Sequence, residues 1–171
     1  MLFKTLKQKY KLKKDPIGYW RERGMTIGKN CEIYSSANFG SEPYMIKLGD
    51  HVRVNSGVTF VTHDGGVWVI RYLDEVLKDA DIFGKISVGS NVHIGTNAII
   101  MPNVTIGDNC IIGCGAVVTR DIPSGSIAVG VPARVIKTVE EYKAKHIEDF
   151  VKTKSLSQEE KRKFITEKYL K

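Results

Sequence analysis

The stretch Ile86–Thr119 reads ISVGSNVHIGTNAIIMPNVTIGDNCIIGCGAVVT and repeats itself every six residues. The period is set by apolar residues at Val88, Ile94, Ile100, Ile106, Ile112 and Val118. A helix would space its apolar residues by three and four, and an ordinary strand would alternate them strictly between turns. A fixed period of six instead predicts a parallel β-helix, in which each repeat supplies one short strand and one corner.

Three such repeats would close one triangular coil. The β-branched residue of each repeat would point inward and stack on its counterpart in the next coil, while glycine, asparagine and aspartate tolerate the tight corners. The same period is seen earlier in the chain in two runs, which are Ile27 with Ile33, and Leu48 with Val54 and Phe60. The polar stretch SSANFGSEPY, residues 35–44, lies between them and is interpreted as irregular. The expected fold class is mainly β, with helices at both ends.

A break in the period divides the predicted β-helix. From Phe60 to Val88 the interval is twenty-eight residues, which is not a multiple of six. The chain must therefore leave the β-helix, and we expect an extruded loop at residues 62–85. Loops that stand on a rigid scaffold are where binding and catalytic groups concentrate.

Length and composition are those of one globular domain. The 171 residues are 42% hydrophobic and 26% charged, and no apolar run is long enough to cross a membrane. The basic start of the chain lacks the apolar core of a secretory signal, so we expect a cytoplasmic protein. The cysteines Cys31, Cys110 and Cys114 favour neither a disulfide framework nor a zinc site, because their number is odd and they lack paired close spacing.

The formal net charge of +7 lies at the two ends of the chain. Residues 1–23 carry +6, residues 24–136 carry −2 and residues 137–171 carry +3. Apolar residues near helical spacing predict a basic amphipathic helix over residues 1–15. We expect first a structural role on the end of the β-helix, and second a contact of residues 1–14 with an anionic membrane surface. Nucleic-acid binding is not favoured, because the lysines lack interleaved base-stacking aromatic residues.

The C-terminal part is predicted to be helical. One helix is expected over residues 139–152, and after a break near Ser155 a second helix opens with Ser157 as N-cap and Glu160 three residues on. These helices would cover the open end of the β-helix. The expected organisation is a basic segment at 1–24, a β-helix domain at 25–137 and a helical cap at 138–171.

The hexapeptide run resembles the left-handed β-helix of the hexapeptide-repeat acyltransferases. The segment TIGDNCIIGCGAVVTRDIPSGSIAVGVPARVIK, Thr105–Lys137, is similar to the closing coils of the maltose and galactoside O-acetyltransferase branch. The resemblance extends over residues 27–137. It implies a left-handed coil, a homotrimer, and the transfer of an acetyl group from acetyl-CoA to a hydroxyl of a saccharide, without a metal.

His63, in the segment VTHDGG, stands where the repeats stop and the loop begins. It matches the general base of the family, which occupies the same transition. A neutral imidazole there would take a proton from the sugar hydroxyl as its oxygen attacks the thioester, and no covalent intermediate is needed. In agreement with direct attack, the chain contains no G-x-S-x-G nucleophile elbow.

Three residues near His63 are candidates for contact with the acceptor. Asn38 matches the asparagine of the family's AN-F segment, which binds the acceptor sugar, although its spacing to the histidine is shorter here. Glu42, in GSEPY, is a second candidate. Asp64 is the third, and the sequence leaves open whether it orients the imidazole or caps the loop turn.

The resemblance also assigns a binding site for acetyl-CoA. Backbone groups of four residues would contact the pantetheine arm, namely Gly95, Thr96, Gly113 and Cys114. Four side chains would lie near the nucleotide and its phosphates, namely Thr119, Arg120, Arg134 and Lys137. Arg120 stands where the family has lysine, and a guanidinium can bind phosphate through two hydrogen bonds.

The sequence is also compatible with other functions. The same base could serve N-acetylation of an amino sugar, and other hexapeptide proteins bind metal, as γ-type carbonic anhydrases do, or act as scaffolds. The acceptor is not specified by any periodic part of the chain. By analogy we expect a capsule or lipopolysaccharide precursor, either a small molecule or lipid-linked.

Overall fold

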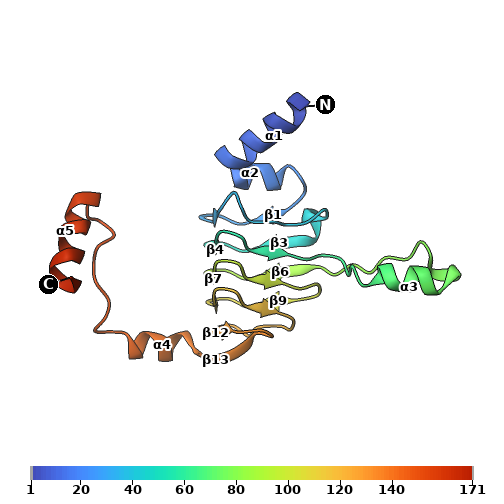
Figure 1. Ribbon diagram of the computed structural model, residues 1–171. Coiled ribbons are helices and arrows are strands. Elements are labelled where there is room, and N and C mark those ends of the chain that lie inside the picture. The colour runs from blue at the N-terminus through green and yellow to red at the C-terminus, as the bar shows by residue number, and fades with distance from the viewer. Residues whose placement is uncertain (1, 171) are drawn as a thin grey trace. The chain divides into compact units, whose positions relative to one another are not determined.

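The repeats form a β-helix whose strands lie in three sheets, as predicted (Figure 1). The computed structural model describes residues 2–170, with the side chains of residues 6–170. Sheet A contains β1 (Thr26–Ile27), β3 (Ile46–Leu48), β6 (Ile86–Val88) and β9 (Thr105–Ile106). Sheet B contains β2 (Glu32–Ile33), β4 (Val52–Val54), β7 (Val92–Ile94), β10 (Ile111–Ile112), β12 (Ser126–Val129) and β13 (Arg134–Thr138). Sheet C contains β5 (Thr59–Phe60), β8 (Ile99–Ile100) and β11 (Val117–Val118).

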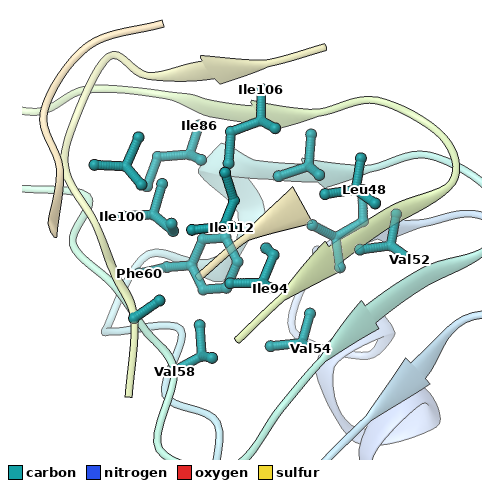
Figure 2. Packing of buried hydrophobic residues seen from close by; sticks show 14 of the residues in the cluster. Leu48, Val52, Val54, Val58, Phe60, Ile86, Ile94, Ile100, Ile106 and Ile112 are labelled. Carbon is teal, nitrogen blue, oxygen red and sulfur yellow. The ribbon is translucent and has the colours of Figure 1, made fainter. Parts of the chain in front are cut away.

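Equivalent residues of neighbouring coils pair in parallel. Ile94 pairs with Ile112, and Ile100 pairs with Val118, each eighteen residues further on. Two residues of each repeat point inward, the strand's apolar residue and the one two positions before it, and Figure 2 shows how they fill the interior. Full burial of one such aliphatic side chain stabilises the fold by roughly 1.5–3 kcal/mol. The stacked interior therefore holds the coils in register.

The stretch at residues 35–44 is more regular than predicted. Phe39 continues the six-residue series after Ile33 and is fully buried, with Ala37 inward beside it. The Phe39 ring stacks on Phe60 at 4.8 Å between centroids and meets Trp20 edge-on at 5.0 Å. The interpretation of residues 35–39 as irregular was thus wrong, because small and polar neighbours hid an aromatic residue at the inward position.

Both interruptions of the period occur between sheet C and sheet A, in consecutive coils. Ile27 pairs with Leu48 across twenty-one residues, three more than a regular coil. Leu48 pairs with Val88 across forty residues, twenty-two more than a regular coil. The first interruption contains the short helix η1 (Pro43–Met45), and the second forms an arm with α3 (Val67–Leu73) and η2 (Glu75–Leu77), which projects from the β-helix (Figure 1).

The corner between sheets A and B is built from side chains that bond the next coil. The amide of Lys29 donates to Asp50 at 2.7 Å, and that of Ser90 donates to Asp108 at 2.6 Å. Between these, the Asp50 amide donates to the Ser90 hydroxyl at 3.0 Å. Short side chains that accept from backbone amides stabilise such turns. The corner therefore links successive coils independently of the apolar interior.

The N-terminal helix is confirmed as α1 (Leu2–Lys14), and a second helix, α2 (Pro16–Arg21), follows it. Asp15 caps α2 by accepting from the Gly18 amide at 2.8 Å. Trp20 of α2 is buried on the aromatic column formed with Phe39. The helices thereby cover the first coil.

The C-terminal elements follow the prediction in part. β12 and β13 pair antiparallel, α4 (Val139–Lys145) and α5 (Gln158–Tyr169) are helices, and the predicted Ser157 cap of α5 forms with Glu160 as a capping box. The first helix is shorter than expected, because the chain turns at His146, whose ring bonds Asp149 at 2.8 Å. The chain forms two compact units, Met1–Glu140 and Glu141–Lys171, so the helical cap over the β-helix stays a prediction. No helix within residues 2–170 has the length and apolarity to span a membrane.

We predict that Gly89→Ala destabilises the β-helix by about 1–3 kcal/mol. A Cβ at Gly89 would lie 2.8 Å from the backbone nitrogen of Asp108 and the carbonyl carbon of Gly107, so neighbouring coils would have to separate. Thermal unfolding measures the effect. The matched control is Gly65→Ala in the arm, where nothing lies within 4 Å of the new Cβ, and equal melting temperatures for the two variants would contradict the proposed role of close coil contact.

Candidate active site

His63 lies at the base of the arm, three residues after the end of the core strand β5. Its backbone forms an antiparallel bridge with Phe83. On either side of this bridge the Gly84 amide donates to the Thr62 carbonyl at 2.8 Å, and the Asp64 amide donates to the Ile82 carbonyl at 2.9 Å. The two ends of the arm are thus held together, and the histidine is fixed on a short two-stranded base.

A carboxylate from the preceding coil meets this histidine. Glu42 lies at the N-cap position of η1, within the three extra residues of the first coil. Its Oε2 lies 3.0 Å from Nδ1 of His63 and accepts a hydrogen bond of 2.7 Å from the Thr62 hydroxyl. A hydrogen bond from the Thr62 hydroxyl is the largest cause that lowers the pKa of Glu42 below its ordinary value, and a hydrogen bond from Ser41 is the second. Burial has the opposite effect and raises this pKa.

The three side chains form a gradient from the interior to the surface. Thr62 is 1% exposed, the Glu42 side chain is 15% exposed and the His63 side chain is 45% exposed. The imidazole is therefore supported from within and accessible from outside. Phe83 stands beside it, with ring centroids 6.4 Å apart, and adds an apolar wall. An imidazole supported in this way is suited to accept a proton from a bound molecule.

The predicted acceptor residues have different surroundings. Of the three, Glu42 is hydrogen-bonded to His63. Asn38 is exposed and accepts from the Gly40 amide at 3.0 Å, and Asp64 accepts from the Gly66 amide at 2.8 Å. Of the two roles left open for Asp64, capping of the loop turn is the one that this bond serves.

Thr62 is a member of this group that was not predicted from the sequence. Its place directly before His63 was visible in the sequence, but nothing in the period indicated that its hydroxyl faces Glu42. Asn38 pairs with Thr59 in sheet C. Residues 42 and 62 come after these two paired positions, and they therefore lie at the same corner, one coil apart. The six-residue series places Phe39 inward, and this was the signal in the sequence that could have indicated the corner shared by residues 42 and 62.

The residues predicted for the pantetheine arm lie at the corner between sheets B and C. Gly95 donates from its amide to the Ile112 carbonyl at 2.8 Å, and Gly113 donates to the Ala128 carbonyl at 2.9 Å. These two amides are therefore engaged between coils and are not available to a ligand. Thr96 and Cys114 lie next to them, half-buried and exposed respectively. This corner precedes the strands of sheet C, whereas His63 lies at the corner that follows them. One chain therefore does not bring the base to this corner.

The predicted phosphate contacts lie further along the β-helix. Thr119 and Arg120 are exposed and follow β11, at the same corner as His63 but two coils on, which is about 10 Å at the usual strand spacing. Arg134 and Lys137 lie on β13, and Arg134 is exposed. Within the described residues, no group of three or more histidine, cysteine, aspartate or glutamate side chains could hold a metal ion.

Comparison with known proteins gives three kinds of likeness. The family model "Bacterial transferase hexapeptide (six repeats)" matches residues 85–120. Protein CapG of Staphylococcus aureus is 44% identical over 151 residues, which are 87% of this chain and 86% of CapG. Galactoside O-acetyltransferase of Escherichia coli K12 is 35% identical over 126 residues, 72% of this chain and 59% of that protein. A solved galactoside acetyltransferase in complex with coenzyme A has a TM-score of 0.57 and 26% identity, with 83% of this chain and 82% of that chain covered.

Proposed function

The chain belongs to the hexapeptide-repeat acyltransferases, and on this premise we propose that it transfers the acetyl group of acetyl-CoA to a hydroxyl group of a saccharide. The observation that carries the proposal is the half-exposed imidazole of His63, supported by a carboxylate at the base of the arm. The galactoside O-acetyltransferase among its relatives supports the choice of a sugar hydroxyl, and the coenzyme A complex of a structural neighbour supports the choice of acyl donor.

The proposed reaction needs one base and no covalent enzyme intermediate. His63 takes the proton of the saccharide hydroxyl as that oxygen forms a bond to the acetyl carbon. The bond between the carbonyl carbon and sulfur then breaks, and the proton held by His63 passes to the departing thiolate. The products are an acetyl ester and coenzyme A. Asn38, which pairs with Thr59 of β5, and Phe83, which stands beside the imidazole, are the proposed contacts to the sugar.

The proposed assembly is a homotrimer of left-handed β-helices with each site between two subunits. The corner with Thr96 and Cys114 precedes the strands of sheet C, and His63 lies at the corner that follows them. A second chain is therefore needed to bring a base to a pantetheine site. The arm also exposes several large apolar side chains, of which Tyr72 is 92% and Val76 is 90% exposed. A surface of this kind typically marks a protein interface. Arg120, Arg134 and Lys137 are the proposed phosphate contacts.

The acceptor proposed is a precursor of capsule or lipopolysaccharide, and α1 is the proposed contact with a membrane on which such precursors are built. Leu6 and Tyr10 are exposed one helical turn apart, with Lys7, Lys9 and Lys13 exposed around them. The first five side chains of this segment lie outside the described residues. Apolar side chains flanked by lysines suit the anionic surface of a membrane.

We predict that wild-type protein with acetyl-CoA releases free thiol faster when a suitable saccharide is present, and that His63→Ala lowers the rate by about 10²–10⁴. A screen of neutral, acidic and amino sugars by thiol release measures this. His146→Ala, which removes a histidine from the C-terminal unit, is the control and keeps the wild-type rate. Thiol release that no saccharide accelerates would falsify the proposed reaction, and a product acetylated on nitrogen would move it to amino sugars.

We predict that Tyr72→Ser combined with Val76→Ser converts the trimer to monomer, because polar groups would replace apolar surface at the interface. Light scattering of purified protein measures the mass. Tyr10→Ser on α1 removes an equally aromatic exposed side chain and should leave the mass at three chains. A wild-type protein with the mass of one chain would exclude the assembly.

We predict that wild-type protein sediments with vesicles that contain anionic lipid and not with neutral vesicles. Each lysine near such a surface contributes about 1 kcal/mol, so replacement of Lys7, Lys9 and Lys13 by glutamine should weaken binding about a hundredfold. The control replaces Lys29, Lys47 and Lys85, exposed on the first unit outside α1, and removes the same charge. If both triple variants bind alike, α1 has no special role.

A further inference from the structure

We propose that Glu42 is the positioning residue of this site: from the preceding coil it holds His63 in the form that carries its proton on Nδ1 and leaves Nε2 free as the base. The sequence had predicted that Glu42 binds the acceptor. The new assignment rests on the proposed role of His63 in acetyl transfer, and it concerns how the imidazole is oriented before the acceptor arrives.

The direction of the two hydrogen bonds follows from the chemistry of the groups. An ionised carboxylate can only accept hydrogen bonds, so both bonds to Glu42 Oε2 have their donors elsewhere. Thr62 donates from its hydroxyl at 2.7 Å, and His63 donates from Nδ1 at 3.0 Å. A neutral imidazole has one N–H group, and with that proton on Nδ1 the lone pair of Nε2 is available to a substrate.

The charge of Glu42 is maintained at the pH where the enzyme would work. The Thr62 hydroxyl is the largest cause of a lowered pKa, and Ser41 adds to it. The lowered pKa keeps Glu42 ionised at neutral pH, and an ionised carboxylate accepts both bonds without a proton of its own. The carboxylate therefore stays an acceptor for the Nδ1 proton of His63 throughout the neutral range.

The backbone that follows Glu42 holds it in place. Pro43, the next residue, is buried, and the Met45 amide donates to the Glu42 carbonyl at 3.0 Å in the first turn of η1. Ile46, at the end of this turn, is a core residue of sheet A. The carboxylate thus stands on a short turn anchored in the interior.

The geometry is less suited to binding a sugar. The Glu42 side chain is 15% exposed, and its Oε2 already accepts from two side chains. A sugar hydroxyl that replaced either donor would break the support of His63. Orientation by Asp64 has no comparable basis, because that carboxylate accepts from the Gly66 amide.

Magnetic resonance of histidine labelled with nitrogen-15 tests the proposal directly, since the chain has four histidines. At a pH where His63 is neutral, its Nδ1 should show the signal of a protonated nitrogen and its Nε2 that of an unprotonated one. In Glu42→Ala this preference should be lost. Glu32→Gln, which removes an exposed carboxylate paired with Arg53 on sheet B, is the matched control and should keep the wild-type spectrum.

Kinetics separate positioning from acceptor binding. A His63 with the wrong tautomer should lower kcat by about 10²–10⁴, as a base of this kind does when its orienting carboxylate is lost, with little change in KM for the saccharide. Glu42→Gln, close in size to the native residue, provides the same comparison if the alanine variant fails to fold. An unchanged tautomer in both Glu42 variants, or a raised KM at constant kcat, would overturn the proposal.

The spectra also distinguish failure of this proposal from failure of the proposed function. If the tautomer of His63 follows Glu42 but no saccharide accelerates thiol release, the pairing is right and the acceptor class is wrong. If thiol release depends on His63 but the tautomer of His63 is the same with and without Glu42, the proposed reaction is supported and the positioning role of Glu42 is wrong.

Discussion

The structure depends on the stacking of equivalent residues from one coil to the next. Val88 lies on Ile106 and Ile94 lies on Ile112 because each strand adds to its sheet in a single register. A shift of one residue would place the apolar side chains of a repeat outside. Any extra residue must therefore be accommodated at a corner, where the strands are not displaced. This constraint decides where the chain can carry a functional group that the repeat does not contain.

The candidate site is formed by extra residues that two neighbouring coils carry at the same corner. Three extra residues in the first coil bring Glu42 outward, and twenty-two extra residues in the second coil begin with His63. Because the coils are adjacent, two residues that are twenty-one apart in sequence come within hydrogen-bonding distance. The regular repeats that follow provide the scaffold and the predicted surface for the cosubstrate. The site is therefore attached to two neighbouring coils although it lies on the surface.

The β-helix and the position of His63 at the break in its period could be predicted from the sequence, because an apolar period of six is a direct consequence of coil geometry. The partner of His63 could not. Phe39 marks the true phase of the first coil, but its polar neighbours concealed it, so the position of Glu42 relative to the next coil was not apparent. The helix α3 was also missed, because residues in an arm follow local preferences that no neighbouring coil enforces.

The Asp and Ser side chains at the corner between sheets A and B give the molecule a further property. Each of them accepts a hydrogen bond from a backbone amide of the coil before it, as Ser90 does from Asp50 and Asp108 does from Ser90. A coil in the middle is bonded on both sides, whereas a coil at either end has one such neighbour. Loss of structure should therefore advance from the ends of the β-helix toward its middle, so the coils between β6 and β11 should be the last to open.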